Sequence, residues 1–116
     1  MYDICPKIEF ILLMIENIEK VISRHKKITF ALDDIEGQAA ILMFLMQIGE
    51  TLNKIYQKNP KFIIDNHLEI ETKGSYNVRN FIAHDYEGVN LSLVDSILRD
   101  NIPLLKAKLL KVCNEQ

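Results

Sequence analysis

The stretch AAILMFLM at residues 39–46 decides the fold, because it places apolar side chains on every side of a helix for more than two turns. A helix at a protein surface needs only one apolar stripe. Asp33, followed by Glu36, has the form of a capping box, and the helical pattern then runs uninterrupted to about Lys58. The sequence therefore predicts a long helix over about 33–58 that is central in a bundle, buried in a homodimer interface, or both.

The segment before this helix predicts an amphipathic helix from Lys7 to about Arg24. Its isoleucines recur at alternating spacings of three and four residues, at Ile8, Ile11, Ile15, Ile18 and Ile22. The helix ends in the basic run RHKK at 24–27, which suits the negative end of a helix dipole. A contact between this run and RNA is the alternative interpretation.

Turn signals divide the chain after the long helix. Asn59-Pro60 has the form of an N-cap followed by proline at the first helical position, which predicts a short helix. The residues from Asp65 to Gly74 show no sustained period and predict an irregular connection. Ser75 is placed to cap the next helix and Gly88 to stop it.

The end of the chain predicts an amphipathic segment and a closing helix. Leu91 to Leu98 has helical apolar spacing, and Pro103 stands where the first turn of a last helix tolerates proline. No segment alternates with the period of two that marks a half-buried strand, and nothing repeats. We therefore expect one all-α domain over residues 1–116, an antiparallel bundle of four or five helices.

Composition limits the classes of function. The formal net charge of -2 excludes a broadly basic nucleic-acid-binding surface, so an RNA contact would depend on a local cluster. The two cysteines, Cys5 and Cys113, are read as reduced thiols, which favours a cytoplasmic protein. The longest apolar run has eight residues, too few to cross a bilayer, and the N-terminus lacks the pattern of a secretion signal. We expect a cytoplasmic protein that makes no membrane contact.

Phosphate-handling side chains concentrate in the run RNFIAHDY at residues 79–86. Arg79 offers a forked, permanent cation, and His84 can take and give a proton near neutral pH. Metal-free cleavage of RNA needs little more than this. A base deprotonates the ribose 2′-hydroxyl, an acid protonates the departing 5′-oxygen, and a cation stabilises the charge developing on phosphorus.

Helical geometry divides this run between two faces. Residues five apart are separated by about 140° around a helix, so Arg79 and His84 would not share a face, whereas Asn80 and His84 would. The run therefore predicts half a site. A second copy in a symmetric dimer, or a break in the helix near Ala83, would bring an arginine and a histidine onto one phosphate.

The pattern Arg79-x4-His84-x-Tyr86 resembles the Arg-x4-His-x-Tyr motif of the HEPN superfamily, specifically its HepT-like toxin branch. The resemblance extends over nearly the whole chain and includes the run 47–50 (QIGE) of the long helix, where this branch usually carries Ile/Leu-Gly-Glu. The family typically has a Trp-containing helix close before the arginine. This chain instead has a Trp-free polar stretch from Asn66 to Asn77 that resembles an insertion.

The resemblance implies a HEPN-like homodimer that is a metal-independent endoribonuclease toxin, with RNA as substrate and without a cofactor. Arg79 and His84 match the family's catalytic pair. Asn80 matches the common polar residue after the arginine, and Asp85 is placed beside it as a supporting residue. Tyr86 matches the tyrosine that a minimal nucleotidyltransferase antitoxin modifies with AMP. Neutralisation would come from complex formation or from this AMP, which puts bulk and negative charge where an RNA phosphate must approach.

Other interpretations stay open. The chain would alternatively be a non-catalytic module that binds a nucleotide or substrate for a nucleotidyltransferase, or a structural dimer in which Arg79 and His84 form a salt-bridged helix end. Glu50, on the long helix, is either an exposed residue or an inward counter-charge for Arg79. His25, His67 and the two cysteines are too dispersed to form a metal-binding pattern.

Overall fold

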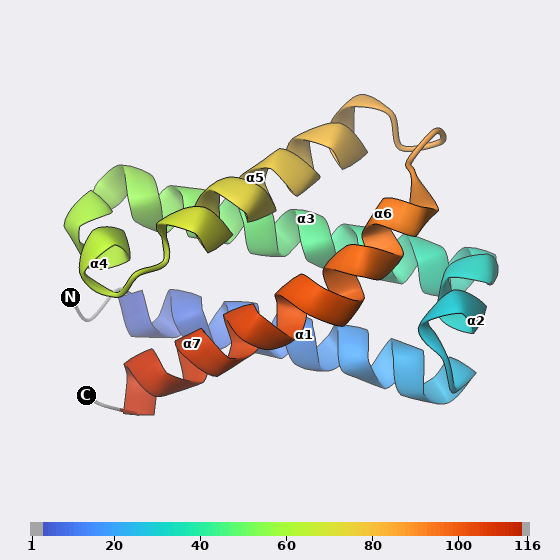
Figure 1. Cartoon of the computed structure of the whole chain (residues 1–116), viewed down its shortest axis with the longest axis horizontal. Coiled ribbons are helices and arrows are strands. Elements are labelled where there is room, and N and C mark those ends of the chain that lie inside the picture. Colours follow the sequence, from blue (N-terminus) through green and yellow to red (C-terminus); the bar gives the residue numbers. More distant parts are fainter. Residues whose placement is uncertain (1–3, 115–116) are drawn as a thin grey trace.

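Helix α3 (Ile35–Lys58) runs through the middle of the structure, a computed structural model that describes residues 4–114. Helix α1 (Ile4–His25) packs along one side of α3, and helix α5 (Glu69–His84) packs along the other (Figure 1). The all-round apolar stretch of α3 is therefore covered on two sides within a single chain. This confirms the central place that the sequence predicts, while the homodimer stays a prediction.

Shorter helices join these three and close the bundle. Helix α2 (Ile28–Asp33) links α1 to α3, and helix α4 (Pro60–Asp65) links α3 to α5. After α5, helix α6 (Leu91–Ser96), the π-helical turn η1 (Ile97–Asn101) and helix α7 (Ile102–Asn114) follow one another as one continuous rod that packs on α1 (Figure 1). Neighbouring long helices run antiparallel, and no strand occurs within residues 4–114. The all-α bundle is as predicted.

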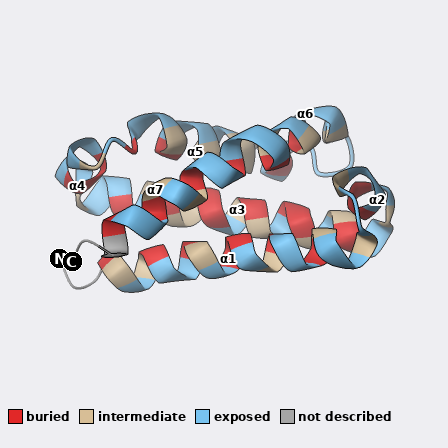
Figure 2. Cartoon of the chain, turned by 60° about the horizontal axis from the view of Figure 1, so that its bottom comes forward, coloured by how far each residue is buried: buried red, intermediate tan, exposed pale blue. Residues whose placement is uncertain are grey.

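The core lies between α3 and the helices around it, and each helix is buried on one side and exposed on the other (Figure 2). The largest fully buried side chains are all isoleucine or leucine, which suits the close packing of helices. They are Ile8, Ile11, Ile15, Ile18, Ile41, Leu42, Ile48, Leu52, Ile55, Ile63, Leu68 and Ile82. The isoleucine stripe of α1 is thus in the core, with Ile22 only partly buried.

The start of α3 differs from the prediction by one residue. Asp34, not Asp33, is the N-cap, and its carboxylate accepts a hydrogen bond from the backbone N–H of Gly37 at 2.9 Å. Asp33 instead ends the unexpected helix α2. A Cβ at Gly37 would lie 2.4 Å from the carbonyl oxygen of Ala31, so the glycine lets α2 fold back against α3.

The prediction of an irregular connection over residues 65–74 is wrong, because α5 begins at Glu69 and runs through both Gly74 and Ser75. Most of the stretch from Asn66 to Asn77 is therefore helix rather than an inserted loop. This helix is difficult to predict from the sequence. Only Thr72 and Ile82 of α5 are buried, so the helix carries no continuous apolar stripe that a periodic pattern could indicate. Packing on α3 stabilises α5 despite its weak propensity.

The other cap predictions have mixed outcomes. Asn59 caps α4 as expected, with its side chain accepting from the N–H of Phe62 at 3.3 Å. Helix α5 ends at His84 with Asp85 as its C-cap, so Gly88 lies in the following turn and does not stop the helix. Pro103 follows a π-helical turn. In this turn the N–H of Ile102 donates to the carbonyl oxygen of Ile97, five residues back, so the chain stays helical up to the proline.

None of the helices in the described part of the chain is both long and apolar enough to cross a membrane. The side chain of Cys113, for which the sequence predicts a reduced thiol, lies outside the described residues.

Candidate active site

Arg79 lies near the C-terminal end of α5, and its guanidinium is held by two acceptors. Its Nε donates to Oε2 of Glu50 at 2.8 Å, and its Nη1 donates to Oδ1 of Asn80 at 3.0 Å. The ring of Tyr76 lies 5.8 Å from the guanidinium carbon. The Arg79 side chain is still 31% exposed. Two of the five N–H groups of an arginine are thus engaged, and the others are left for an anion from solvent.

Glu50 is therefore the counter-charge for Arg79, which decides between the two interpretations that the sequence left open. The pair is compatible with both the catalytic and the purely structural interpretation of Arg79, so the structural interpretation stays open. Since the Glu50 side chain is 39% exposed, the ion pair contributes little to folding stability. Its effect is to fix where the guanidinium points.

The residue before Glu50 determines how closely α3 and α5 approach. A Cβ at Gly49 would lie 2.4 Å from the carbonyl oxygen of Ser75 and 2.8 Å from Cβ of Arg79. Only glycine permits this crossing without displacing backbone. In the run Ile48-Gly49-Glu50, the first side chain fills the core, the second position admits α5, and the third holds Arg79.

His84 is the last residue of α5, and its side chain is exposed. The helix continues through Ala83 and ends at His84, so no break separates Arg79 from His84. Arg79 and His84 consequently lie about 140° apart around α5, as the helical spacing predicts. Within one chain, the structure brings Arg79 to Asn80 and Glu50 but does not bring it to His84.

Asp85 and Tyr86 lie in the turn after α5. The carboxylate of Asp85 accepts a hydrogen bond from the N–H of Gly88 at 3.0 Å, and this closes the turn. A Cβ at Gly88 would collide with that carboxylate, at 2.3 Å from Oδ2, so the glycine makes room for the bond. Tyr86, carried by this turn, is 43% exposed. Asp85 thus supports the position of Tyr86 rather than the guanidinium of Arg79.

The remaining histidines lie away from this site. His25 joins the end of α1 to the cap of α3, with Nε2 at 3.1 Å from Oδ2 of Asp34 and Nδ1 at 2.8 Å from the carbonyl of Val21. The hydrogen bond to Val21 and then that to Asp34 raise the pKa of His25 above 6.5. His67 is exposed in the turn before α5. Within the described residues, no three His, Cys, Asp or Glu side chains are grouped to hold a metal.

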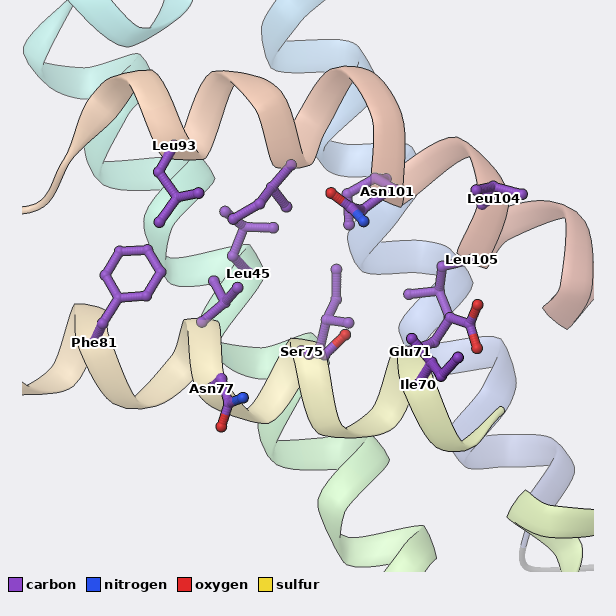
Figure 3. A pocket seen from close by; sticks show the side chains of 15 residues that line it. Leu45, Ile70, Glu71, Ser75, Asn77, Phe81, Leu93, Asn101, Leu104 and Leu105 are labelled. Carbon is purple, nitrogen blue, oxygen red and sulfur yellow. The ribbon is translucent and has the colours of Figure 1, made fainter. Parts of the chain in front are cut away.

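An apolar groove of about 340 Å³ separates α5 from the α6 to α7 rod (Figure 3). Phe81 and Leu93 point toward each other at one end, Ile70 lies at the other, and Leu45 of α3 lies between the two helices. No motif or periodic pattern in the sequence predicts this groove. The available signal was Ile70, an apolar residue among polar ones, which is 83% exposed.

Comparisons with known proteins agree with the motif. Residues 11–112 match the model of the family described as ribonuclease HepT-like, and this range contains Glu50, Arg79, His84 and Tyr86. The chain is also similar to a protein of Methanocaldococcus jannaschii named as a candidate RNase, with 26% identity over 96 residues, 81% of this chain and 76% of that protein. No solved structure shows a significant match. The chain therefore belongs to the HepT-like ribonuclease family.

Proposed function

We propose that the chain is a metal-independent endoribonuclease toxin in which Arg79 and His84 act on the scissile phosphate. The observation that carries the proposal is the guanidinium of Arg79, which Glu50 and Asn80 orient while it keeps free donors. It lies on the same short helix as the exposed imidazole of His84, in a chain of a ribonuclease family. In this proposal residues 1–116 form one catalytic domain.

The chemistry needs a proton to be taken from the 2′-hydroxyl and a proton to be given to the 5′-oxygen. The neutral imidazole of His84 removes the proton of the ribose 2′-hydroxyl, and the 2′-oxygen attacks phosphorus. The bond from phosphorus to the 5′-oxygen then breaks, and the imidazolium formed in the first step protonates that oxygen. The products are a cyclic 2′,3′-phosphate and a free 5′-hydroxyl. Arg79 stabilises the negative charge on the phosphoryl oxygens as the bonds change.

A homodimer would complete this arrangement, because Arg79 and His84 of one chain lie on different sides of α5. The groove beside α5 supports a second copy there. Apolar side chains at its rim are unusually open to solvent, Ile70 at 83%, Leu104 at 58% and Leu93 at 46%. Monomers rarely expose contiguous apolar surface of this kind.

Tyr86 is the proposed point of control by a nucleotidyltransferase antitoxin in the cytoplasm. Its ring is exposed in a turn that Asp85 and Gly88 hold beside the end of α5. Transfer of AMP from ATP to the phenol oxygen, with release of pyrophosphate, would add a negative charge two residues from His84 and repel an RNA phosphate. Formation of a complex over the same turn would block the site without a covalent change.

Growth arrest and RNA cleavage test the proposal. Induced expression should stop growth, and the purified protein should cleave RNA in EDTA. His84→Ala should reduce cleavage by at least about 100-fold, as expected for loss of a general acid or base. Full cleavage by this variant would exclude the assigned role. Nucleotide binding without cleavage by the wild type would favour the alternative, a non-catalytic partner of a nucleotidyltransferase.

A further inference from the structure

A second hollow, of about 410 Å³, lies between α1 and α3. Lysine is its most frequent lining residue. Its walls are Pro6, Lys7 and Phe10 of α1 and Thr51, Lys54 and Lys58 of α3, and we refer to these six residues as the lysine pocket. Three cations and an aromatic ring around one hollow are unusual on a chain whose net charge is -2.

No carboxylate of residues 4–114 forms an ion pair with any of the three lysines of the pocket. Four of the eight other lysines are paired, in Lys20–Glu16, Lys61–Asp65, Lys106–Glu19 and Lys108–Glu71. Glu9 does not reach the pocket, because it lies two residues from Lys7 and so on nearly the opposite side of α1. The pocket therefore presents uncompensated positive charge.

The pocket lies in line with the candidate active site. Glu50, Lys54 and Lys58 are spaced four residues apart on α3 and so share one face of the helix. Glu50 holds Arg79, and the rise of a helix places Lys54 about 6 Å and Lys58 about 12 Å farther along the axis. Helix α5 runs antiparallel to α3 (Figure 1). His84 follows Arg79 on α5, whereas Lys54 and Lys58 follow Glu50 on α3, so the pocket and His84 lie on opposite sides of Arg79 along the bundle.

This face is separate from the apolar groove. Leu45 lines the groove and Lys54 lines the lysine pocket, and their offset of nine positions corresponds to about 180° around α3. A second copy seated on the groove would leave the lysine pocket open to solvent.

We propose that the lysine pocket binds the backbone of single-stranded RNA next to the scissile phosphate. The inference rests on the proposed ribonuclease function and extends it to the substrate: a strand with its reacting phosphate at Arg79 continues past Lys54 and Lys58. Ammonium groups neutralise neighbouring phosphates, and the ring of Phe10, which is 38% exposed, offers a surface for a base. The substrate is therefore an oligonucleotide of several residues, not a dinucleotide.

The charge contribution is tested with Lys54→Ala/Lys58→Ala, in which both changed residues are exposed. Binding is measured by fluorescence anisotropy with a 2′-O-methyl oligonucleotide, which lacks the attacking hydroxyl and cannot be cleaved. Each lost phosphate contact should reduce the slope of log affinity against log salt by about 0.7. With cleavable RNA, KM should rise about tenfold or more while kcat stays unchanged, because Arg79 and His84 are intact.

Two further variants separate specific from general effects. Lys61→Ala/Lys111→Ala removes the same charge from exposed positions on α4 and α7 and should bind RNA like the wild type. Phe10→Leu should weaken binding several-fold without changing the salt slope, since stacking involves no counterion.

The outcomes distinguish the two proposals. If wild-type protein cleaves RNA and Lys54→Ala/Lys58→Ala binds the oligonucleotide with unchanged affinity and salt slope, the lysine pocket is not an RNA site, and the ribonuclease proposal stands. If wild-type protein binds RNA through the pocket but cleaves none, the ribonuclease proposal fails alone. Equally tight binding of a poly-glutamate peptide, lost in the same variant, would overturn the RNA assignment in favour of an acidic protein partner.

Discussion

Nε of Arg79 lies 2.8 Å from Oε2 of Glu50, across the contact between α5 and α3. The two residues are 29 positions apart in the sequence, and the pair forms only because Gly49 lets the two helices approach. Glu50 touches no part of an RNA substrate in the proposed mechanism. It is a positioning residue, whose effect on catalysis passes through the guanidinium.

Glu50→Gln should therefore impair cleavage more than folding. The amide keeps a hydrogen-bond acceptor for Nε but loses the charge that aligns the guanidinium, and misplacement of about 1 Å lowers kcat by about 10- to 100-fold. The free energy of unfolding should change by less than about 1 kcal/mol, because the pair is partly exposed. Glu19→Gln, which breaks the exposed pair with Lys106, is the control and should leave cleavage unchanged. Wild-type kcat in Glu50→Gln would rule out the positioning role.

Two glycines that face different surroundings should respond in opposite directions to alanine. At Gly49 the new Cβ meets the backbone oxygen of Ser75 at 2.4 Å, so Gly49→Ala should destabilise the fold by about 1–3 kcal/mol and displace Arg79. At Gly74 nothing lies within 4 Å, so Gly74→Ala should stabilise α5 by about 0.5–1 kcal/mol. Chemical denaturation followed by circular dichroism measures both. Equal stability of the two variants would contradict the close approach of α3 and α5.

A composite site predicts complementation between two inactive variants. If each site takes Arg79 from one copy and His84 from the other, a heterodimer of Arg79→Ala and His84→Ala keeps one intact site of two. Random mixing makes about half of all dimers heterodimers, so about a quarter of wild-type activity should return. The measurement is RNA cleavage after the two proteins are co-refolded. Absence of any recovery, with heterodimers verified by mass spectrometry, would exclude a site of this composition.

Tyr86→Phe should separate catalysis from control. The phenol oxygen is the proposed acceptor of AMP and takes no part in the phosphate chemistry, so the variant should cleave RNA like the wild type. Incubated with a nucleotidyltransferase antitoxin and ATP, the wild type should gain the mass of one AMP per chain and lose activity, whereas Tyr86→Phe should do neither. Tyr56→Phe, which changes another exposed tyrosine, should be modified as the wild type is. AMP found on Tyr86→Phe would place the acceptor elsewhere.

The His25–Asp34 pair should make stability depend on pH. The pKa of His25 is raised from 6.5, by the bond to Val21 and then by Asp34, so its contribution is complete below pH 6.5 and is lost as pH rises through the raised value. The pKa of Asp34 is lowered from 3.8, by the N–H of Gly37 and then by His25, so its contribution is lost as pH falls below 3.8. The pair therefore stabilises most between these limits.

His25→Asn should accordingly lower Tm most at about pH 5 and least at about pH 9. His67→Asn, which changes an exposed histidine in a left-handed turn that asparagine tolerates, should show no such pH dependence. A Tm difference for His25→Asn that is the same at both pH values would contradict the linkage.

The sequence predicts the elements whose burial leaves a periodic pattern. The isoleucines of α1 and the apolar run of α3 face the core, so their spacing is visible without a structure. Helix α5 is different, because its contact with α3 is made at Gly49 and Ser75, where close backbones replace apolar side chains. The sequence therefore indicates a loop where the structure has the start of a helix.

The candidate site divides in the same way. The placement of Arg79 and His84 on different faces follows from their spacing alone, and the helix observed through His84 agrees with it. The role of Glu50 could not be decided, since a partner 29 positions away depends on how two helices cross. The sequence assigns the N-cap of the long helix to Asp33 instead of Asp34, because both residues directly precede a helical pattern. In the structure Asp33 is the last residue of α2, so only Asp34 has the non-helical backbone of an N-cap.

The separation of Arg79 and His84 around α5 has a consequence for dosage. Under the proposed dimer, a lone chain has no complete site, so at low levels the number of working sites rises with the square of the number of chains. A few chains that escape neutralisation would then form almost no active dimers. A large increase in synthesis would raise the concentration of active dimers steeply. The five-residue spacing in α5 would thus act as a safeguard for the cell that makes the protein.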